Sequence, residues 1–114
     1  MIPSFKLNIL GTDYTIHLKS KADDPMFDRC DGYCDKTSKT IAVVFDDPDT
    51  DLDDYGVYAR KSLRHEIIHA ALFESGLHGN WKHDEWGHDE TTIDWFANQF
   101  PKLVELFREA RCLA

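Results

Sequence analysis

The 114-residue sequence lacks any run of about twenty apolar residues, the length that a helix needs to cross a bilayer. We therefore expect no membrane-spanning segment. The N-terminus has no basic stretch followed by a long apolar one, which argues against an export signal. Lys and Arg total 13 against 21 Asp and Glu, and they form no dense basic run, so direct nucleic-acid binding is disfavoured.

Cysteine is scarce, and its spacing does not indicate a structural metal site. The chain holds Cys30, Cys34 and Cys112, with no second pair at zinc-finger spacing that would complete a four-ligand set. Proteins without an export signal usually keep their thiols reduced. We therefore expect a cytoplasmic protein with free cysteines.

The first half of the chain has the pattern of β-strands. Residues 5–10 and 14–18 alternate in character on either side of Gly11-Thr12-Asp13, which is typical of a hairpin. Residues 32–34 and the strongly β-prone segment that follows them predict two further strands. We expect a small, mostly antiparallel sheet of three to four strands.

A long helix is expected after the strands. Thr50 and Asp51 are candidate N-caps, so the helix should begin near Leu52, and acidic residues in its first turn suit the helix dipole. Apolar and aromatic residues then recur at helical spacing as far as Gly76, which is a natural C-cap.

A second helical pattern begins at about Asp89. Pro101 is expected to break or kink this helix before a terminal helical segment. The elements together predict an α+β fold for a single domain of residues 1–114. In this fold the sheet packs beside the long helix and one or two C-terminal helices.

The first predicted helix contains the segment His65-Glu66-Ile67-Ile68-His69. His65 and His69 are four residues apart, so their imidazoles project from one face and can bind a single zinc ion. Glu66 places a carboxylate beside the metal, where it can take a proton from zinc-bound water. The segment therefore predicts a zinc hydrolase.

A site with two histidines needs at least one further protein ligand. The metzincin pattern requires Gly and His three and six residues after His69, and Leu72 and Ser75 stand there, so that class is excluded. Glu90 is distinctive because Asp94 follows it on the same face of the second predicted helix. The downstream candidates are His78, His83, Asp84, Glu85, His88, Asp89, Glu90 and Asp94.

The two motifs together resemble those of the gluzincins, and the run that begins at Glu90 is similar to that of the ImmA/IrrE-like peptidases. The resemblance implies that His65, His69 and Glu90 bind one zinc ion. It also implies that Glu66 is the general base and acid of the reaction. Asp94 would accept an N–H from a ligand histidine and so fix the orientation of its ring.

We therefore expect a zinc-dependent metallopeptidase that hydrolyses peptide bonds through a zinc-bound water activated by Glu66. The resemblance suggests that a polypeptide substrate pairs with the strand from Thr40 to Phe45. One alternative is a catalytically inactive zinc-binding regulatory module of the same fold. Another is a metal-free interaction domain.

The transition state of peptide hydrolysis carries an oxyanion, for which metallopeptidases often supply a donor side chain besides the metal. The sequence does not choose among the possible donors, which are His78, His83, His88, Tyr55 and Tyr58.

Overall fold

The computed structural model describes residues 3–80 and 90–114, without the side chains of Asn80, Glu90, Ile93 and Ala97. It confirms the expected α+β class. One four-stranded sheet has the order β1-β2-β4-β3, and α1 and α2 follow it in the chain. The strands are β1 (Ser4–Ile9), β2 (Thr12–Ser20), β3 (Gly32–Asp35) and β4 (Thr40–Asp46); the α-helices are α1 (Tyr55–Ser75) and α2 (Glu90–Glu109).

The sheet is mostly antiparallel, as expected. The hairpin of β1 and β2 and the pair of β3 and β4 are antiparallel, whereas β2 and β4 run parallel. Two short 3-10 helices, η1 (Lys21–Asp23) and η2 (Pro25–Asp28), connect β2 to the edge strand β3. The chain then returns as β4, which lies between β3 and β2 and pairs in parallel with β2. β3 is therefore an edge strand and β4 an interior one.

The position of β4 corrects the expected site of substrate pairing. The strand from Thr40 to Phe45 was expected to offer its backbone to a peptide, but β4 is hydrogen-bonded to β2 on one side and β3 on the other. Its central residues, from Ile41 to Val44, are buried on both faces, which explains their continuous apolar run. The free edge on this side of the sheet belongs to β3.

Helix α1 begins three residues later than Leu52, the position that its sequence indicated. Its N-cap is Asp54, whose carboxylate accepts a hydrogen bond from the Val57 N–H at 3.3 Å. The predicted cap Thr50 instead accepts from the Leu52 N–H at 3.1 Å and so closes a turn before the helix. The C-cap at Gly76 is confirmed, with φ at 82°.

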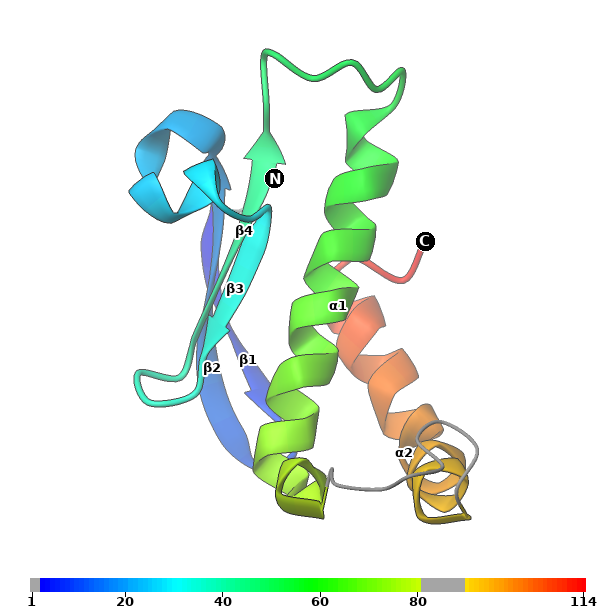
Figure 1. Cartoon of the computed structure of the whole chain (residues 1–114). Helices are drawn as coiled ribbons and strands as arrows, with labels where there is room; N and C mark the ends of the chain where they lie inside the picture. Colours follow the sequence, from blue (N-terminus) through cyan, green and yellow to red (C-terminus); the bar gives the residue numbers. More distant parts are fainter. Residues whose placement is uncertain (1–2, 81–89) are drawn as a thin grey trace.

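Helix α2 is one continuous helix that contains Pro101, so of the two expected outcomes, a break or a kink, the helix does not break. Figure 1 shows that α2 changes direction part-way along its length, as a proline in a helix interior favours. The short 3-10 helix η3 (Leu77–Asn80) follows α1. In the described part of the chain, we find no helix with the length and apolar character that a bilayer crossing requires.

Helix α1 covers one face of the sheet, and α2 lies beside it (Figure 1). Leu63 and Ile67 of α1 are fully buried, together with Ile16 and Ile41 of the sheet and Leu103 of α2. This packing fixes one face of α1 against the sheet and leaves the opposite face at the surface.

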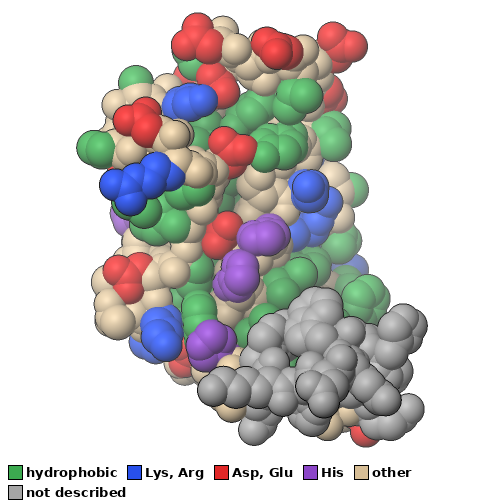
Figure 2. All heavy atoms as spheres, in the orientation of Figure 1, with side chains coloured by type: hydrophobic (Ala, Val, Ile, Leu, Met, Phe, Trp, Pro, Cys, Tyr) green, Lys and Arg blue, Asp and Glu red, His purple; other side chains and the backbone are tan. Residues whose placement is uncertain are grey.

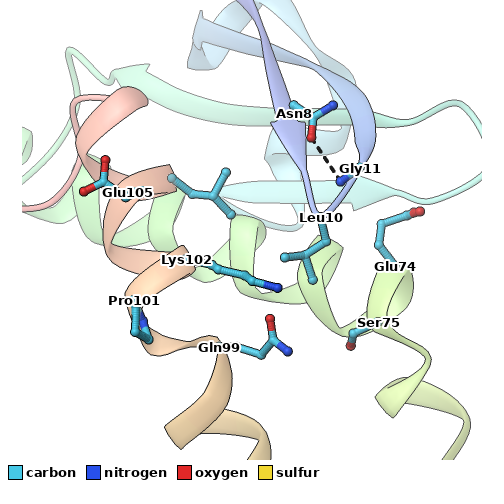
Figure 3. Close-up of a pocket in the computed structure, with 10 residues that line it drawn as sticks. Asn8, Leu10, Gly11, Glu74, Ser75, Gln99, Pro101, Lys102 and Glu105 are labelled. Atoms are coloured by element: carbon cyan, nitrogen blue, oxygen red, sulfur yellow. Dashed lines mark hydrogen bonds between the residues drawn. The ribbon is translucent and has the colours of Figure 1, made fainter.

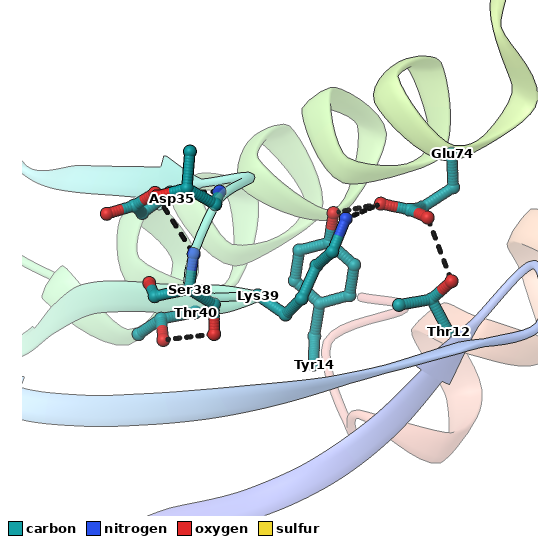
Figure 4. Close-up of polar contacts among 8 residues, drawn as sticks. Thr12, Tyr14, Asp35, Ser38, Lys39, Thr40 and Glu74 are labelled. Carbon is teal, nitrogen blue, oxygen red and sulfur yellow. Dashed lines mark hydrogen bonds and ion pairs between the residues drawn. The ribbon is translucent and has the colours of Figure 1, made fainter.

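Glu74, near the end of α1, anchors the helix to the sheet (Figure 4). Its carboxylate accepts hydrogen bonds from the Thr12 hydroxyl at 2.8 Å and the Tyr14 hydroxyl at 2.6 Å, and it pairs with the Lys39 ammonium at 2.8 Å. Lys39, then Tyr14 and Thr12, lower the pKa of the Glu74 carboxyl to about 2. The charged form of Glu74 therefore stabilises the folded protein.

We expect Glu74→Gln to lower the free energy of unfolding by about 1–2 kcal/mol near neutral pH, because it removes the charge that these three donors bind. The folded pKa lies below the unfolded one, so the advantage of the wild type is complete above about pH 5 and shrinks as the pH falls toward 2. Urea unfolding at about pH 7 and about pH 2.5 measures both values. Glu105→Gln, which removes an exposed ion pair with Arg108, is the control. An equal loss for Glu74→Gln at both pH values would contradict the anchor.

Candidate metal centre

His65 and His69 lie on α1 at the edge of its buried face. The buried positions of the helix, Ala59, Leu63, Glu66, Ile67, Ala70 and Ala71, recur every three or four residues, and both histidines fall just outside this stripe. Their rings are exposed and adjacent, with centroids 4.8 Å apart. Figure 2 shows histidine side chains gathered at the front of the molecule, between the sheet and α1.

The two imidazoles have a geometry that suits zinc. Nε2 of His65 and Nε2 of His69 are 3.2 Å apart. Two nitrogen ligands of a tetrahedral zinc ion, each about 2.05 Å from the metal, lie about 3.3 Å apart. Burial, followed by the neighbouring His65 and His78, lowers the pKa of His69, which favours the neutral ring that binds metal. The imidazoles of His65 and His69 therefore fit the zinc ion that the sequence predicts.

Glu66 is the charged residue on the buried stripe of α1. Glu66 is 8% exposed, and its Oε2 lies 3.9 Å from Nε2 of His65. Burial raises the pKa of the Glu66 carboxyl to about 7. Because burial has already removed much of its hydration, a carboxylate in this position is a stronger base than a surface carboxylate. It can therefore accept a proton beside the two imidazoles.

Edge strand β3 approaches Glu66 closely at a glycine. A Cβ on Gly32 would lie 3.2 Å from the Ala42 carbonyl oxygen and 3.4 Å from both Cγ and Oε2 of Glu66. Cys34, two residues further along β3, packs against the same core as α1, and burial followed by the Glu66 charge raises the pKa of its thiol to about 12. The absence of a side chain at Gly32 thus makes room for the Glu66 carboxylate.

A hollow of about 210 Å³ opens between the start of β3 and α1. It contains His65 and Glu66 and extends along α1 toward its N-terminus. Its other lining residues are Asp31, Gly32, Tyr58, Lys61 and Ser62. A larger hollow of about 770 Å³ lies between the β1–β2 turn, the end of α1 and α2 (Figure 3), but neither His65 nor His69 lines it.

Two of the three residues expected to bind zinc, His65 and His69, have described side chains. Within residues 3–80 and 90–114, no three His, Cys, Asp or Glu side chains converge on one point. Glu90 is the first residue of α2, but its side chain lies outside the description. Asp94 is exposed on the first turns of α2, which contact the end of α1 where the Trp95 indole N–H donates to the Ser75 hydroxyl at 3.0 Å. The candidates His83, Asp84, Glu85, His88 and Asp89 lie outside the described residues.

The structure narrows the choice of oxyanion donor among the described candidates. The Tyr55 hydroxyl donates to the Val44 carbonyl at 3.2 Å and lies away from the hollow. The Tyr58 ring lines the hollow, but its hydroxyl donates to Asp31 in a short hydrogen bond. The His78 ring packs edge-on against Phe73, with centroids 4.6 Å apart. Neither tyrosine hydroxyl is therefore free to donate in this arrangement.

No protein-family model, curated protein or solved structure matches this chain. The geometry of α1 and β3 is therefore the observation on which a functional assignment depends.

The residues at the start of β3 and just before it that line the hollow were not predicted from the sequence. Asp31 and Gly32 carry no motif, and only the pairing of β3 with β4 brings them to Glu66 and Tyr58. Lys61, one helical turn before His65, could have been found from the helical spacing alone.

We expect Gly32→Ala to lower the free energy of unfolding by about 1 kcal/mol, because the added methyl group would press on the Ala42 carbonyl while Glu66 already occupies the space beside it. Gly79→Ala is the matched control, since a Cβ there meets no atom within 4 Å. Thermal and urea unfolding of both variants measure the difference. If the two variants are equally stable, the space around Gly32, between the Ala42 carbonyl and Glu66, is not as tight as described.

Proposed function

We propose that the protein is a zinc-dependent metallopeptidase. The observation that carries this proposal is the 3.2 Å separation of the His65 and His69 Nε2 atoms, with the buried Glu66 carboxylate beside them. The same separation allows a hydrogen bond between the two rings in the absence of metal, so the buried acid beside them, which costs free energy to desolvate, is what favours a functional role. The spacing of Glu90 and Asp94, which resembles that of the gluzincins, supports the same assignment.

His65, His69 and Glu90 would hold one zinc ion, and Asp94 would orient a ligand histidine. The chemistry that a bound zinc ion supplies is a lowered pKa for its water and a polarised peptide carbonyl. Glu66 takes the proton from the attacking water and returns it to the leaving amine. Burial on the helix stripe raises the pKa of the Glu66 carboxyl to about 7, which makes Glu66 a stronger base than a surface carboxylate.

The substrate would be a polypeptide in extended form, bound along the free edge of β3. This edge lies beside Glu66, whereas β4 is paired on both sides. Backbone hydrogen bonds to an edge strand bind a peptide irrespective of its sequence, and the hollow would then select side chains. The three free cysteines are consistent with a cytoplasmic location.

The alternative is a zinc-binding regulatory or interaction module of the same fold that does not cleave its partner. The engagement of the Tyr55 and Tyr58 hydroxyls with other acceptors favours this alternative, because it leaves no tyrosine donor for the oxyanion.

Glu66→Gln separates the two functions. We expect the variant to retain zinc, since Glu66 is no ligand, and to lose peptide cleavage by at least about a hundredfold. Elemental analysis and cleavage of an unfolded casein substrate measure the two properties. Glu109→Gln, on the last turn of α2, is the control and should keep both. Unchanged cleavage by Glu66→Gln would exclude Glu66 as the base.

Substitution of the ligands tests the metal site itself. We expect Glu90→Ala to weaken zinc binding far more than His78→Ala, and His65→Ala or His69→Ala to weaken it at least as strongly as Glu90→Ala. Competition with a chromogenic zinc chelator gives the affinities. If His78→Ala has the larger effect, the site belongs to a three-histidine class instead.

A further inference from the structure

Lys61 contributes a cation to the hollow that contains His65 and Glu66, and the proposed chemistry does not use it. Its Nζ lies over the Tyr58 ring, 5.6 Å from the centroid. Among the described residues, the Lys61 ammonium forms neither a hydrogen bond nor an ion pair, although it can donate three hydrogen bonds.

Apart from the uncharged Ser62 hydroxyl, the other polar side chains of this hollow already have partners or roles. The Tyr58 hydroxyl donates to Asp31, which joins the wall formed by α1 to the wall formed by the start of β3. His65 belongs to the metal centre, and Glu66 is the proposed base. Lys61 is therefore the charged group in the hollow that is free to bind a substrate.

The distance from Lys61 to His65, the nearer of the two proposed histidine ligands, indicates where along a bound peptide Lys61 acts. β3 and α1 run side by side in the same direction, since Asp31 contacts Tyr58 at one end and Lys36 lies over the Phe73 ring at the other (Figure 1). Lys61 precedes His65 by four residues, or about 6 Å along the helix axis. An extended peptide covers about 6.6 Å in two residues.

The direction of the peptide then decides which side of the bond Lys61 meets. Antiparallel pairing is the commoner kind, and a peptide antiparallel to β3 has its C-terminal part beside Gly32 and Asp31. Lys61 lies on this side of the metal centre.

We propose that Lys61 is a specificity-determining residue that binds a substrate carboxylate two residues on the C-terminal side of the hydrolysed peptide bond. This inference rests on the proposed peptidase function. The carboxylate can be an Asp or Glu side chain or the C-terminus of the substrate, because the ammonium group binds both alike.

The surrounding charges limit this preference to a single carboxylate. Asp31 and Tyr58 also line a second hollow of about 420 Å³, further toward the N-terminus of α1, to which Asp47, Asp49 and Asp51 contribute. Additional acidic residues of a substrate would meet these carboxylates and be repelled. A longer acidic run should therefore bind no better than one acidic residue.

The test is a degenerate peptide library, prepared both with free and with amidated C-termini, incubated with the zinc-loaded protein. Mass spectrometry of the products gives the residue preference at each position. We expect carboxylate enrichment of about fivefold or more at the second position after the cleaved bond, which corresponds to about 1 kcal/mol. Enrichment of Asp and Glu in both libraries indicates the side chain. Enrichment of chains that end at this position in the free library alone indicates the terminus.

Lys61→Met removes the charge, keeps most of the length of the side chain and introduces another good helix former. We expect it to abolish the enrichment, whereas Lys6→Met on β1, at the opposite edge of the sheet, should preserve it. Unchanged enrichment in Lys61→Met, or none in the wild type, would overturn the inference.

Failure of the peptidase proposal is distinguishable from failure of this inference. If the wild type cleaves nothing, the proposed function is wrong, and the same libraries are then passed over the immobilised zinc-loaded proteins. Preferential retention of carboxylate peptides by the wild type and not by Lys61→Met supports the role of Lys61. Equal retention by both overturns it.

Discussion

The close packing of α1 against β3 and β4 is the constraint on which the rest of this structure depends. Ala70 and Ala71 on the buried stripe of α1, and Gly32 on β3, have small side chains or none, which lets the helix and sheet approach. The same contact buries Glu66 and holds the two histidines at the rim. Within the described residues, the candidate site is thus a product of core packing.

Local features of the fold could be predicted from the sequence because they depend on local chemistry. The turn around Gly11 and the left-handed C-cap at Gly76 follow from the conformations that these residues allow. The interior place of β4 could not be predicted in this way, since strand order depends on contacts distant in sequence. The start of α1 differed from its prediction because Asp54, Asp51 and Thr50 are all competent caps, and packing selected Asp54.

Part of the candidate site could likewise be predicted from local sequence. The spacing of His65 and His69 determines that both imidazoles share one face, and the structure adds that their Nε2 atoms are close enough for one ion. The burial of Glu66 interrupts an otherwise apolar stripe, a local inconsistency typical of functional sites. The hollow that Asp31 and Lys61 share was not predictable, because it forms only where β3 meets α1.

The central claim is that His65 and His69 bind zinc beside Glu66. X-ray absorption spectroscopy of the purified, zinc-loaded protein tests it most directly, because the spectrum identifies the atoms that surround the metal. The account predicts two imidazole nitrogens at about 2.0–2.1 Å, with oxygen atoms completing the set. Sulfur at about 2.3 Å, which would place the ion on a cysteine, or the absence of imidazole scattering would contradict it.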